Sequence, residues 1–362
     1  MKIATWALLG MTAVSAAYHL LAWWATLRHR RQKRVAIPAR LPGISILKPV
    51  RGLDPHFLQA IRSHAEQRYP GEFEILFGVA DAADPAIAVI EQLQREYPGV
   101  TIRLVHSTTQ ALNGKVGCLI DLAREARHSV MLVNDSDILV PTGYLATVVA
   151  ELTEDVGIVT CVYRAHGDSW PAKWEAFGIR CDFAPSTLVA PVVGVREFGL
   201  GATLVFRRAD LEAIGGFEAL KDYLADDYQL ARHIVQKLGK RARMSSVIVD
   251  TFLGDDDWAR VWAHQVRWAR TIRVSRGDGY LGLPVTHAGV WVVLCLLAGQ
   301  VGPAVALFLV RCGSATAAGV RLPFLAVAWD WWAFAVYVAG LTGRTVDWRG
   351  MRLQLQPDGR LH

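Results

Sequence analysis

The sequence predicts an α/β fold, in which helices cover a mostly parallel β-sheet and membrane helices lie at both ends of the chain. Three observations support this prediction. Strand-like and helix-like segments alternate between residues 44 and 133, acidic residues follow two of those strands, and long apolar runs lie toward either end of the chain. Because βαβ units place successive strands in parallel, the alternation favours a parallel sheet with right-handed crossovers.

The first element is an apolar segment, residues 3–27, long enough to cross roughly 30 Å of hydrocarbon as a helix. The basic residues that follow it are Arg28, Arg30, Arg31, Lys33 and Arg34. A signal peptide carries its positive charge before the apolar run, so residues 1–28 are predicted to be a retained anchor. The positive-inside rule keeps the basic cluster in the cytoplasm. The net charge of +6 is interpreted as attraction to a membrane surface, and nucleic acid is not an expected partner.

The main domain is predicted to span residues 40–276. Strands are expected over residues 44–47, 73–80, 101–105, 130–133, 157–163 and 199–206. Helices are expected after Asp54, after Asp84, from Asn113 to about residue 127 and from Leu224 to Leu238. Residues 170–195 show no clear period, and three alternatives remain open for them: a segment against the membrane, the mouth for an acceptor, or a hydrophobic linker.

The last third of the chain is predicted to be helical and apolar. Residues 255–273 have the tryptophans and arginines of an interfacial helix. Two apolar runs, residues 285–310 and 322–341, predict transmembrane helices within residues 284–343, and Arg311 and Arg321 frame the connection between them. The first run contains Gly302-Pro303, so it is either one kinked span or a re-entrant pair. A cytoplasmic tail, residues 344–362, follows. Asp330 would cost about 2.5–3.5 kcal/mol at a bilayer centre, so we expect it near an interface or paired.

Two carboxylates one residue apart, Asp135 and Asp137, follow the expected strand at residues 130–133. In open α/β sheets, ligands bind beyond the carboxyl ends of the strands. An Asp-x-Asp at that edge can hold a hard divalent cation that in turn binds a nucleotide diphosphate. The pattern therefore predicts a sugar-nucleotide site. The alternative is an Asx turn or the N-cap of the next helix.

Further acidic residues extend this prediction. Asp81 ends the second strand and is expected at the same edge of the sheet, where it can accept hydrogen bonds from a uracil or ribose; a turn aspartate is the alternative. Asp226 and Asp227 begin a helix, where the dipole favours negative charge by roughly 0.3–1 kcal/mol. One carboxylate would suffice for that effect, so the second is a candidate general base for an acceptor hydroxyl.

The fourth candidate is His264-Gln265-Val266-Arg267-Trp268, near the end of the interfacial helix. Its arginine is suited to neutralise a diphosphate leaving group, and its tryptophan is suited to line an acceptor site. The alternative is a membrane anchor. The five cysteines form no Cys-x-x-Cys, so zinc is not expected.

In chain order, Asp81, the Asp135-Ser136-Asp137 triplet, Asp227 and Arg267-Trp268 resemble the D, D, D, (Q/R)xxRW pattern of glycosyltransferase family 21, whose best-known members are ceramide glucosyltransferases. Supporting motifs are Ile46-Leu47-Lys48-Pro49, Gly52-Leu53-Asp54-Pro55, Asp84-Pro85-Ala86, Gly114-Lys115 and Gly201-Ala202-Thr203. The resemblance covers about residues 41–273 and is nearest to the bacterial, hopanoid-associated branch of the family.

The resemblance implies a GT-A fold, a UDP-sugar donor, Mg²⁺ or Mn²⁺ as cofactor, and inversion at the anomeric carbon. It implies transfer of N-acetylglucosamine to the polyol of bacteriohopanetetrol, with ceramide or another lipid as the alternative acceptor. The implied setting is a multi-pass protein of the cell inner membrane whose catalytic domain is cytoplasmic.

The resemblance also implies residue roles. Asp227 is the catalytic base, Asp135 and Asp137 bind the metal and diphosphate, and the other donor-site residues are Asp81, Lys115, His264, Arg267 and Trp268. Two positions depart from the family pattern. His264 stands where the motif has Gln or Arg, and Cys181 stands where animal members carry a histidine.

Two rival functions remain at this stage. A processive polysaccharide synthase shares the acidic residues and the Arg-Trp motif, but it must thread a polymer through a channel, for which about three spans are too few. A non-catalytic membrane scaffold or sugar-nucleotide-binding regulator would not need all three carboxylate sites.

Overall fold

The structure is a computed structural model that describes residues 2–33, 35–254, 256–343, 345–348 and 351–362. The chain divides into two compact units. The first, called here the sheet unit, contains residues 33–166, 195–254 and 360–362. The second, called the helical unit, contains residues 1–32, 167–194 and 255–359. The predicted main domain, residues 40–276, therefore contributes segments to both units.

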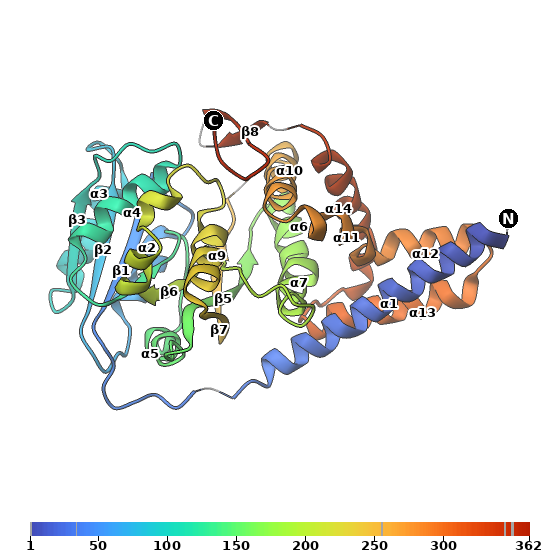
Figure 1. Cartoon of the computed structure of the whole chain (residues 1–362), viewed down its shortest axis with the longest axis horizontal. Coiled ribbons are helices and arrows are strands. Elements are labelled where there is room, and N and C mark those ends of the chain that lie inside the picture. The colour runs from blue at the N-terminus through green and yellow to red at the C-terminus, as the bar shows by residue number, and fades with distance from the viewer. Residues whose placement is uncertain (1, 34, 255, 344, 349–350) are drawn as a thin grey trace. The chain divides into compact units, whose positions relative to one another are not determined.

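The sheet unit is built on a seven-stranded sheet in the order β3-β2-β1-β4-β6-β5-β7 (Figure 1). Its strands are β1 Ile44–Val50, β2 Phe73–Val79, β3 Thr101–His106, β4 Val130–Val133, β5 Val156–His166, β6 Leu204–Arg207 and β7 Arg241–Phe252. Strand β6 runs antiparallel to its neighbours β4 and β5, and the other neighbouring strands are parallel. The prediction of a mostly parallel sheet is confirmed.

Helices cover both faces of this sheet. One core contains side chains of α2 Phe57–Ala65, α3 Ala86–Glu96 and α5 Tyr144–Ala150. The opposite core contains side chains of α4 Gly114–Glu125, α8 Arg208–Ala213, the 3₁₀-helix η2 Phe217–Leu220 and α9 Asp226–Leu238. Successive strand residues alternate between the two, so Ile46 packs in the first core and Leu47 in the second. Burial on both faces explains why β1 is an almost continuous apolar run.

The strands differ from the prediction at several points. Strand β1 continues through Pro49, because the β4 ladder on one side of it stops at Leu47 and the missing proline N–H costs no hydrogen bond there. Strand β6 begins only at Leu204. Strand β7 is absent from the prediction, since most of its residues are partly exposed at an edge of the sheet and half of them carry polar side chains.

The helical unit contains the long N-terminal helix and most of the C-terminal part of the chain. Its elements are α1 Lys2–Arg30, α6 Trp170–Gly178, the π-helix η1 Ile179–Phe183, α7 Ala184–Val189, α10 Trp258–Ser275, α11 Gly277–Gly282, the 3₁₀-helix η3 Leu283–Thr286, α12 Ala288–Leu297, α13 Val301–Ala317, the 3₁₀-helix η4 Pro323–Leu325, α14 Ala326–Gly340, and the hairpin β8 Thr345–Trp348 and β9 Met351–Gln354. Helices α1, α12 and α13 lie side by side (Figure 1).

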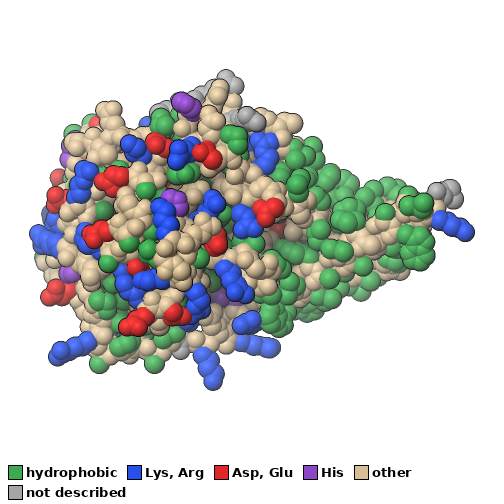
Figure 2. Space-filling model, viewed as in Figure 1, with side chains coloured by type: hydrophobic (Ala, Val, Ile, Leu, Met, Phe, Trp, Pro, Cys, Tyr) green, Lys and Arg blue, Asp and Glu red, His purple; other side chains and the backbone are tan. Residues whose placement is uncertain are grey.

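Hydrophobic side chains cover the exposed surface of these three helices (Figure 2). Trp6 is 73% exposed and Leu297 is 80% exposed. An apolar surface of this extent is unusual for a face that meets water.

Among the described residues, α1 is the one helix long and apolar enough to cross a membrane by itself. Residues Gly277–Thr286 and Ala288–Leu297 meet at 51° and would make a second crossing if they form one span. The predicted run at 285–310 is divided into α12 and α13, and the run at 322–341 is largely α14. These three helices have 10, 17 and 15 residues, so the prediction of C-terminal transmembrane helices is not confirmed.

The segment at residues 170–195 is largely helical. The π-helix η1 lies between α6 and α7, and it shifts the helical register. This shift explains why the sequence shows no clear period there. The predicted interfacial helix is α10, which Asp257 caps by accepting a hydrogen bond from the Arg260 N–H. Arg34 of the predicted basic cluster and Asp255 at the start of the predicted interfacial helix lie outside the described residues, as do residues 344, 349 and 350 of the predicted tail.

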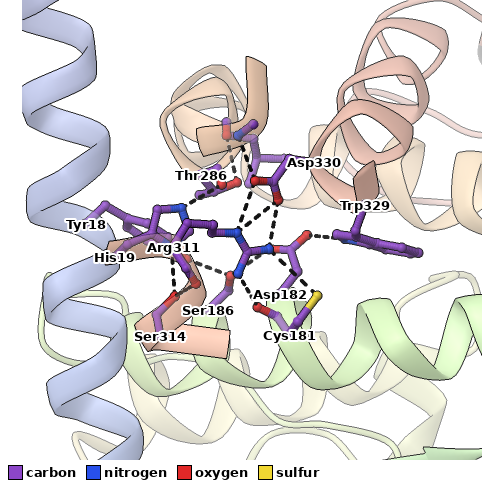
Figure 3. Close-up of polar contacts among 12 residues, drawn as sticks. Tyr18, His19, Cys181, Asp182, Ser186, Thr286, Arg311, Ser314, Trp329 and Asp330 are labelled. Carbon is purple, nitrogen blue, oxygen red and sulfur yellow. Dashed lines mark hydrogen bonds and ion pairs between the residues drawn. The ribbon is translucent and has the colours of Figure 1, made fainter. Parts of the chain in front are cut away.

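Asp330 is paired, as one of the two predicted alternatives required (Figure 3). Its carboxylate accepts hydrogen bonds from Arg311 at 2.8–3.2 Å and from the backbone N–H of Gly289 at 2.8 Å. Arg311 also donates to the carbonyl of Cys181 at 3.0 Å. The prediction that Arg311 borders a connection is wrong, because α13 continues to Ala317 and buries this arginine.

Candidate functional site

The Asp-x-Asp segment follows β4, and its loop is held by buried contacts. Asn134 donates to the ring of His64 at 2.7 Å, and Ser136 donates to Asp54. The carboxylate of Asp137 accepts a hydrogen bond from Thr251. The next helix, α5, begins at Tyr144 with a glycine as its N-cap, so the alternative that an aspartate of this segment caps it is wrong.

Lys115 lies between two carboxylates. Its Nζ is 2.7 Å from Asp135 Oδ1 and 3.7 Å from Asp226 Oδ2. The lysine side chain is 11% exposed, whereas that of Asp135 is 45% exposed. Burial opposes a charge on Lys115, but Asp135 and Asp226 outweigh it and raise the pKa of the lysine well above its usual value. Lys115 is therefore a cation fixed within the acidic cluster.

Asp227 lies near Lys115 and Asp135, next to Gly201. Its Oδ2 accepts the backbone N–H of Gly201 at 2.9 Å, and its Oδ1 accepts the N–H of Tyr228 at 2.7 Å. A Cβ atom on Gly201 would lie 3.3 Å from Asp135 Oδ2, 3.5 Å from Asp227 Oδ2 and 3.6 Å from Lys115 Nζ. Three of the residues singled out in the sequence, at 115, 135 and 227, thus converge on one glycine. In the sequence, Gly201 belongs only to the supporting motif Gly201-Ala202-Thr203, which gives no sign of this contact.

Two carboxylates of this site take up protons more readily than an ordinary aspartate. Burial, and then the charge of Asp226, raise the pKa of Asp227 to about 6. Burial, and then the charge of Asp135, raise the pKa of Asp137 to about 6, although the hydrogen bond from Thr251 opposes this. A carboxyl group with such a pKa can exchange a proton near neutral pH, which a general base requires.

Lys48 is a further member that was not predicted as a site residue. It is fully buried at the end of β1, and its Nζ donates to the backbone carbonyl of Asp135 at 3.1 Å. Burial lowers the pKa of Lys48 to about 7, against the opposing effects of Asp137, Asp135 and Asp54. The sequence signal for it is a charged residue directly after the predicted strand at residues 44–47, in the supporting motif Ile46-Leu47-Lys48-Pro49.

Asp81 follows β2 at the same edge of the sheet as the Asp-x-Asp segment. Parallel strand β1 lies between β2 and β4, so this part of the prediction is confirmed. The side chain is exposed, and its Oδ1 accepts the backbone N–H of Ala83 at 2.9 Å. The structure therefore shows a turn aspartate, and its role toward a nucleotide stays a prediction.

The His264-to-Trp268 segment lies on α10 in the helical unit. His264 Nδ1 donates to Glu175 Oε1 at 2.7 Å, and Gln265 donates to the same oxygen at 2.7 Å. The Glu175 side chain is 2% exposed. The ring of Trp268 contacts those of His264 and Phe183, at centroid distances of 4.7 and 5.5 Å. Glu175 was not predicted, because a lone glutamate in an apolar segment gives no sign of its partners.

The donor groups near Asp135 decide whether a metal ion fits this site. Among the described residues, no group of three or more His, Cys, Asp or Glu side chains is arranged to hold a metal ion. Mg²⁺ commonly takes one or two carboxylates and completes its shell with water and substrate phosphates. Asp135 and Asp137 fit that pattern, and the ammonium of Lys115 beside Asp135 shows that a cation is accommodated at this carboxylate.

The fold is shared with a solved sugar-transferring enzyme. The structure resembles "Mannosyltransferase PcManGT from Pyrobaculum calidifontis in complex with GDP-Man and Mn2+", with a TM-score of 0.59 and 20% sequence identity over 92% of this chain and 99% of that chain. The chain belongs to glycosyl transferase family 21, since the model of that family matches residues 7–361. The family predicted from the sequence motifs is confirmed.

The names of several relatives of this chain contain a lipid. Ceramide glucosyltransferase 1 of Caenorhabditis elegans is 28% identical over 246 residues, which are 66% of this chain and 52% of the relative. Beta-monoglucosyldiacylglycerol synthase of Trichormus variabilis is 24% identical over 228 residues, which are 62% of this chain and 47% of the relative. The chain spans about half the length of these relatives.

Proposed function

We propose that this chain is an inverting, metal-dependent glycosyltransferase that moves a sugar from a UDP donor to a hydroxyl group of a membrane lipid. The observation that carries the proposal is the convergence of Asp135, Lys115 and Asp227 around Gly201. A carboxylate for the cation, an ammonium for the diphosphate and a carboxylate with a raised pKa for the acceptor are the parts that such a transfer needs.

In the proposed reaction, Asp227 accepts the proton of the acceptor hydroxyl. The hydroxyl oxygen forms a bond to the anomeric carbon, the bond from that carbon to the phosphate oxygen breaks, and UDP leaves with the electron pair. Each Asp227 oxygen accepts one backbone N–H and keeps lone pairs for a substrate proton. A divalent cation at Asp135 and Asp137 would offset the charge of the leaving diphosphate.

Lys115 has a second task in this scheme. Its ammonium is 2.7 Å from Asp135 and would offset the negative charge of a diphosphate held there through the cation. His264, Arg267 and Trp268 are proposed to act at the diphosphate and the acceptor, as in the (Q/R)xxRW motif.

The acceptor is proposed to be a lipid for two reasons. The curated relatives carry ceramide and diacylglycerol in their names, and the exposed apolar surface of α1, α12 and α13 is suited to a bilayer. A hopanoid polyol with N-acetylglucosamine as the sugar is the specific proposal, and ceramide is the alternative. We propose that the protein is held in the cell inner membrane, with α12 to α14 completing a multi-pass arrangement and the sheet unit in the cytoplasm.

The full chain in lipid nanodiscs should be given UDP-N-acetylglucosamine or UDP-glucose with bacteriohopanetetrol, ceramide or diacylglycerol, and products should be identified by mass spectrometry. A monoglycosylated lipid supports the proposal, whereas oligosaccharides would indicate a polysaccharide synthase. Asp227→Asn should retain UDP binding and lose about 10²- to 10⁴-fold in transfer. Wild-type turnover in this variant would refute the role of Asp227 as base.

A second variant tests the metal. Asp135→Ala should abolish the dependence of UDP binding on Mn²⁺ in calorimetric titration. The matched control is Asp155→Asn, which removes an exposed carboxylate that pairs with Arg241 on the surface of the same unit. Unchanged Mn²⁺ dependence in Asp135→Ala would contradict the metal assignment.

A further inference from the structure

The neighbouring carboxylates Asp226 and Asp227 differ in their contacts. Asp227 accepts two backbone N–H groups, whereas Asp226 is buried and contacts two side chains. Its Oδ1 accepts the amide of Asn113 at 3.3 Å, and its Oδ2 is 3.7 Å from Lys115 Nζ. A negative charge at a helix N-terminus needs only one of the pair, so the contacts of Asp226 suggest a separate task.

Asn113 fixes the distance between Asp226 and Lys115. It is the N-cap of α4, and its Oδ1 accepts the backbone N–H groups of Lys115 and Val116 at 3.1 and 3.3 Å. Its Nδ2 donates both to Asp226 and to the carbonyl of Tyr223, at 3.3 and 2.9 Å. One fully buried side chain thus joins the start of α4, which carries Lys115, to the start of α9, which carries Asp226.

The two carboxylate partners of Lys115 are not equivalent. The side chain of Asp226 is 12% exposed and held by Asn113, whereas that of Asp135 is 45% exposed. An ion from solvent can reach Asp135 more easily. If a divalent cation binds Asp135, it replaces the lysine there, and Lys115 then needs another anion to offset its charge in a buried site.

We propose that Asp226 is the positioning residue of Lys115: it retains the ammonium when a divalent cation takes over Asp135, and so leaves Lys115 beside the nucleotide diphosphate. This inference rests on the proposed function, because the cation and the diphosphate belong to it. In the protein without nucleotide, Lys115 competes with an incoming cation for Asp135. In the complex, Lys115 is shared between Asp226 and the diphosphate.

The test is Mn²⁺ binding in the absence of nucleotide, measured by electron paramagnetic resonance on the full chain. Lys115→Met should bind Mn²⁺ about 10-fold more tightly, because the competing ammonium is gone, and should bind UDP in the presence of Mn²⁺ about 10-fold more weakly. Asp226→Asn keeps an acceptor for Asn113 but removes the charge. It should weaken Mn²⁺ binding several-fold, since Lys115 then pairs with Asp135 alone.

The double variant separates positioning from a general loss of negative charge. In the Lys115→Met background, Asp226→Asn should leave Mn²⁺ affinity unchanged within about twofold. An equal weakening in both backgrounds would overturn the inference. The matched control is Asp210→Asn, which removes a buried carboxylate paired with Lys240 at 2.5 Å on other elements of the sheet unit. It should not change Mn²⁺ affinity.

If Asp226→Asn does not fold, Lys115→Met alone decides, because Mn²⁺ binding no tighter than in the wild type would refute the competition for Asp135. A wild-type chain that binds neither Mn²⁺ nor UDP would overturn both the inference and the proposed function. If the wild-type chain binds both Mn²⁺ and UDP, and Asp226→Asn weakens Mn²⁺ binding equally with and without Lys115→Met, only the role of Asp226 is overturned.

Discussion

Two ion pairs of this chain differ in burial. They are Arg311–Asp330 in the helical unit and Lys115–Asp135 in the sheet unit, and each joins a basic side chain to an aspartate. Both side chains of the first pair are 1% exposed, and the pair is closed by the carbonyl of Cys181 and the N–H of Gly289 (Figure 3). In the second pair, Asp135 is nearly half exposed.

The two clusters also differ in charge balance. Arg311 and Asp330 compensate each other one to one. Around Lys115 and Lys48, five carboxyl groups influence the two lysines: Asp54, Asp135, Asp137, Asp226 and Asp227. Burial, and then the negative charge of neighbouring carboxylates, raises the pKa of Asp137 and of Asp227 to about 6. A buried pair whose charges balance joins helices, whereas a cluster with excess negative charge and one half-exposed carboxylate is suited to bind a cation and its anionic ligand.

The largest expected effect comes from breaking the buried Arg311–Asp330 ion pair. Arg311→Met leaves Asp330 buried without its cation and should lower the stability of the folded protein by about 3–5 kcal/mol. Thermal unfolding in detergent, followed by circular dichroism, measures this loss. Arg311→Met combined with Asp330→Leu should recover part of it, because no charge then remains buried. A double variant as unstable as the single one would contradict the assignment of a structural ion pair.

The next largest effect is the pH dependence of activity, which tests the carboxylates around Lys115. Asp227 must be deprotonated to act as a base, and its pKa of about 6 lies above the usual value for aspartate. Activity should therefore be complete above this pKa and fall about tenfold for each pH unit below it. The measurement is kcat/KM for transfer between pH 5 and 8 at saturating Mn²⁺. A flat profile between pH 5 and 7 would argue against Asp227 as the base.

The smallest effect tests the pair of Glu175 and His264. Its burial is intermediate, because the glutamate is buried and the histidine is partly exposed. The carboxylate holds the Nδ1 proton of the histidine, which leaves Nε2 for other contacts. Glu175→Gln should lower kcat/KM about threefold, the value of one modest hydrogen bond. His264→Gln, which restores the residue of the family motif, should be nearly neutral. Glu175→Gln should have no further effect in that background, and an equal loss there would indicate a purely structural glutamate.

Much of the sheet unit can be predicted from residue patterns alone. The apolar runs at residues 44–47 and 130–133 are buried on both faces, so their composition alone identifies them as strands. The carboxyl ends of parallel strands share one edge, and this rule placed Asp81 and Asp135 at the same edge. The motif order from Asp81 to Trp268 was sufficient for the family.

The contacts between side chains of different elements cannot be predicted in this way, because they depend on tertiary packing. The starts of α4 and α9 come together through Asn113, and the turn before β6 brings Gly201 to Asp227, over separations in sequence that no local pattern reports. Arg311 finds Asp330 because the apolar run at 285–310 breaks into two helices and α13 continues past it. Local periodicity reflects the face that each element buries, whereas hydrogen bonds and ion pairs across elements depend on how those faces pack.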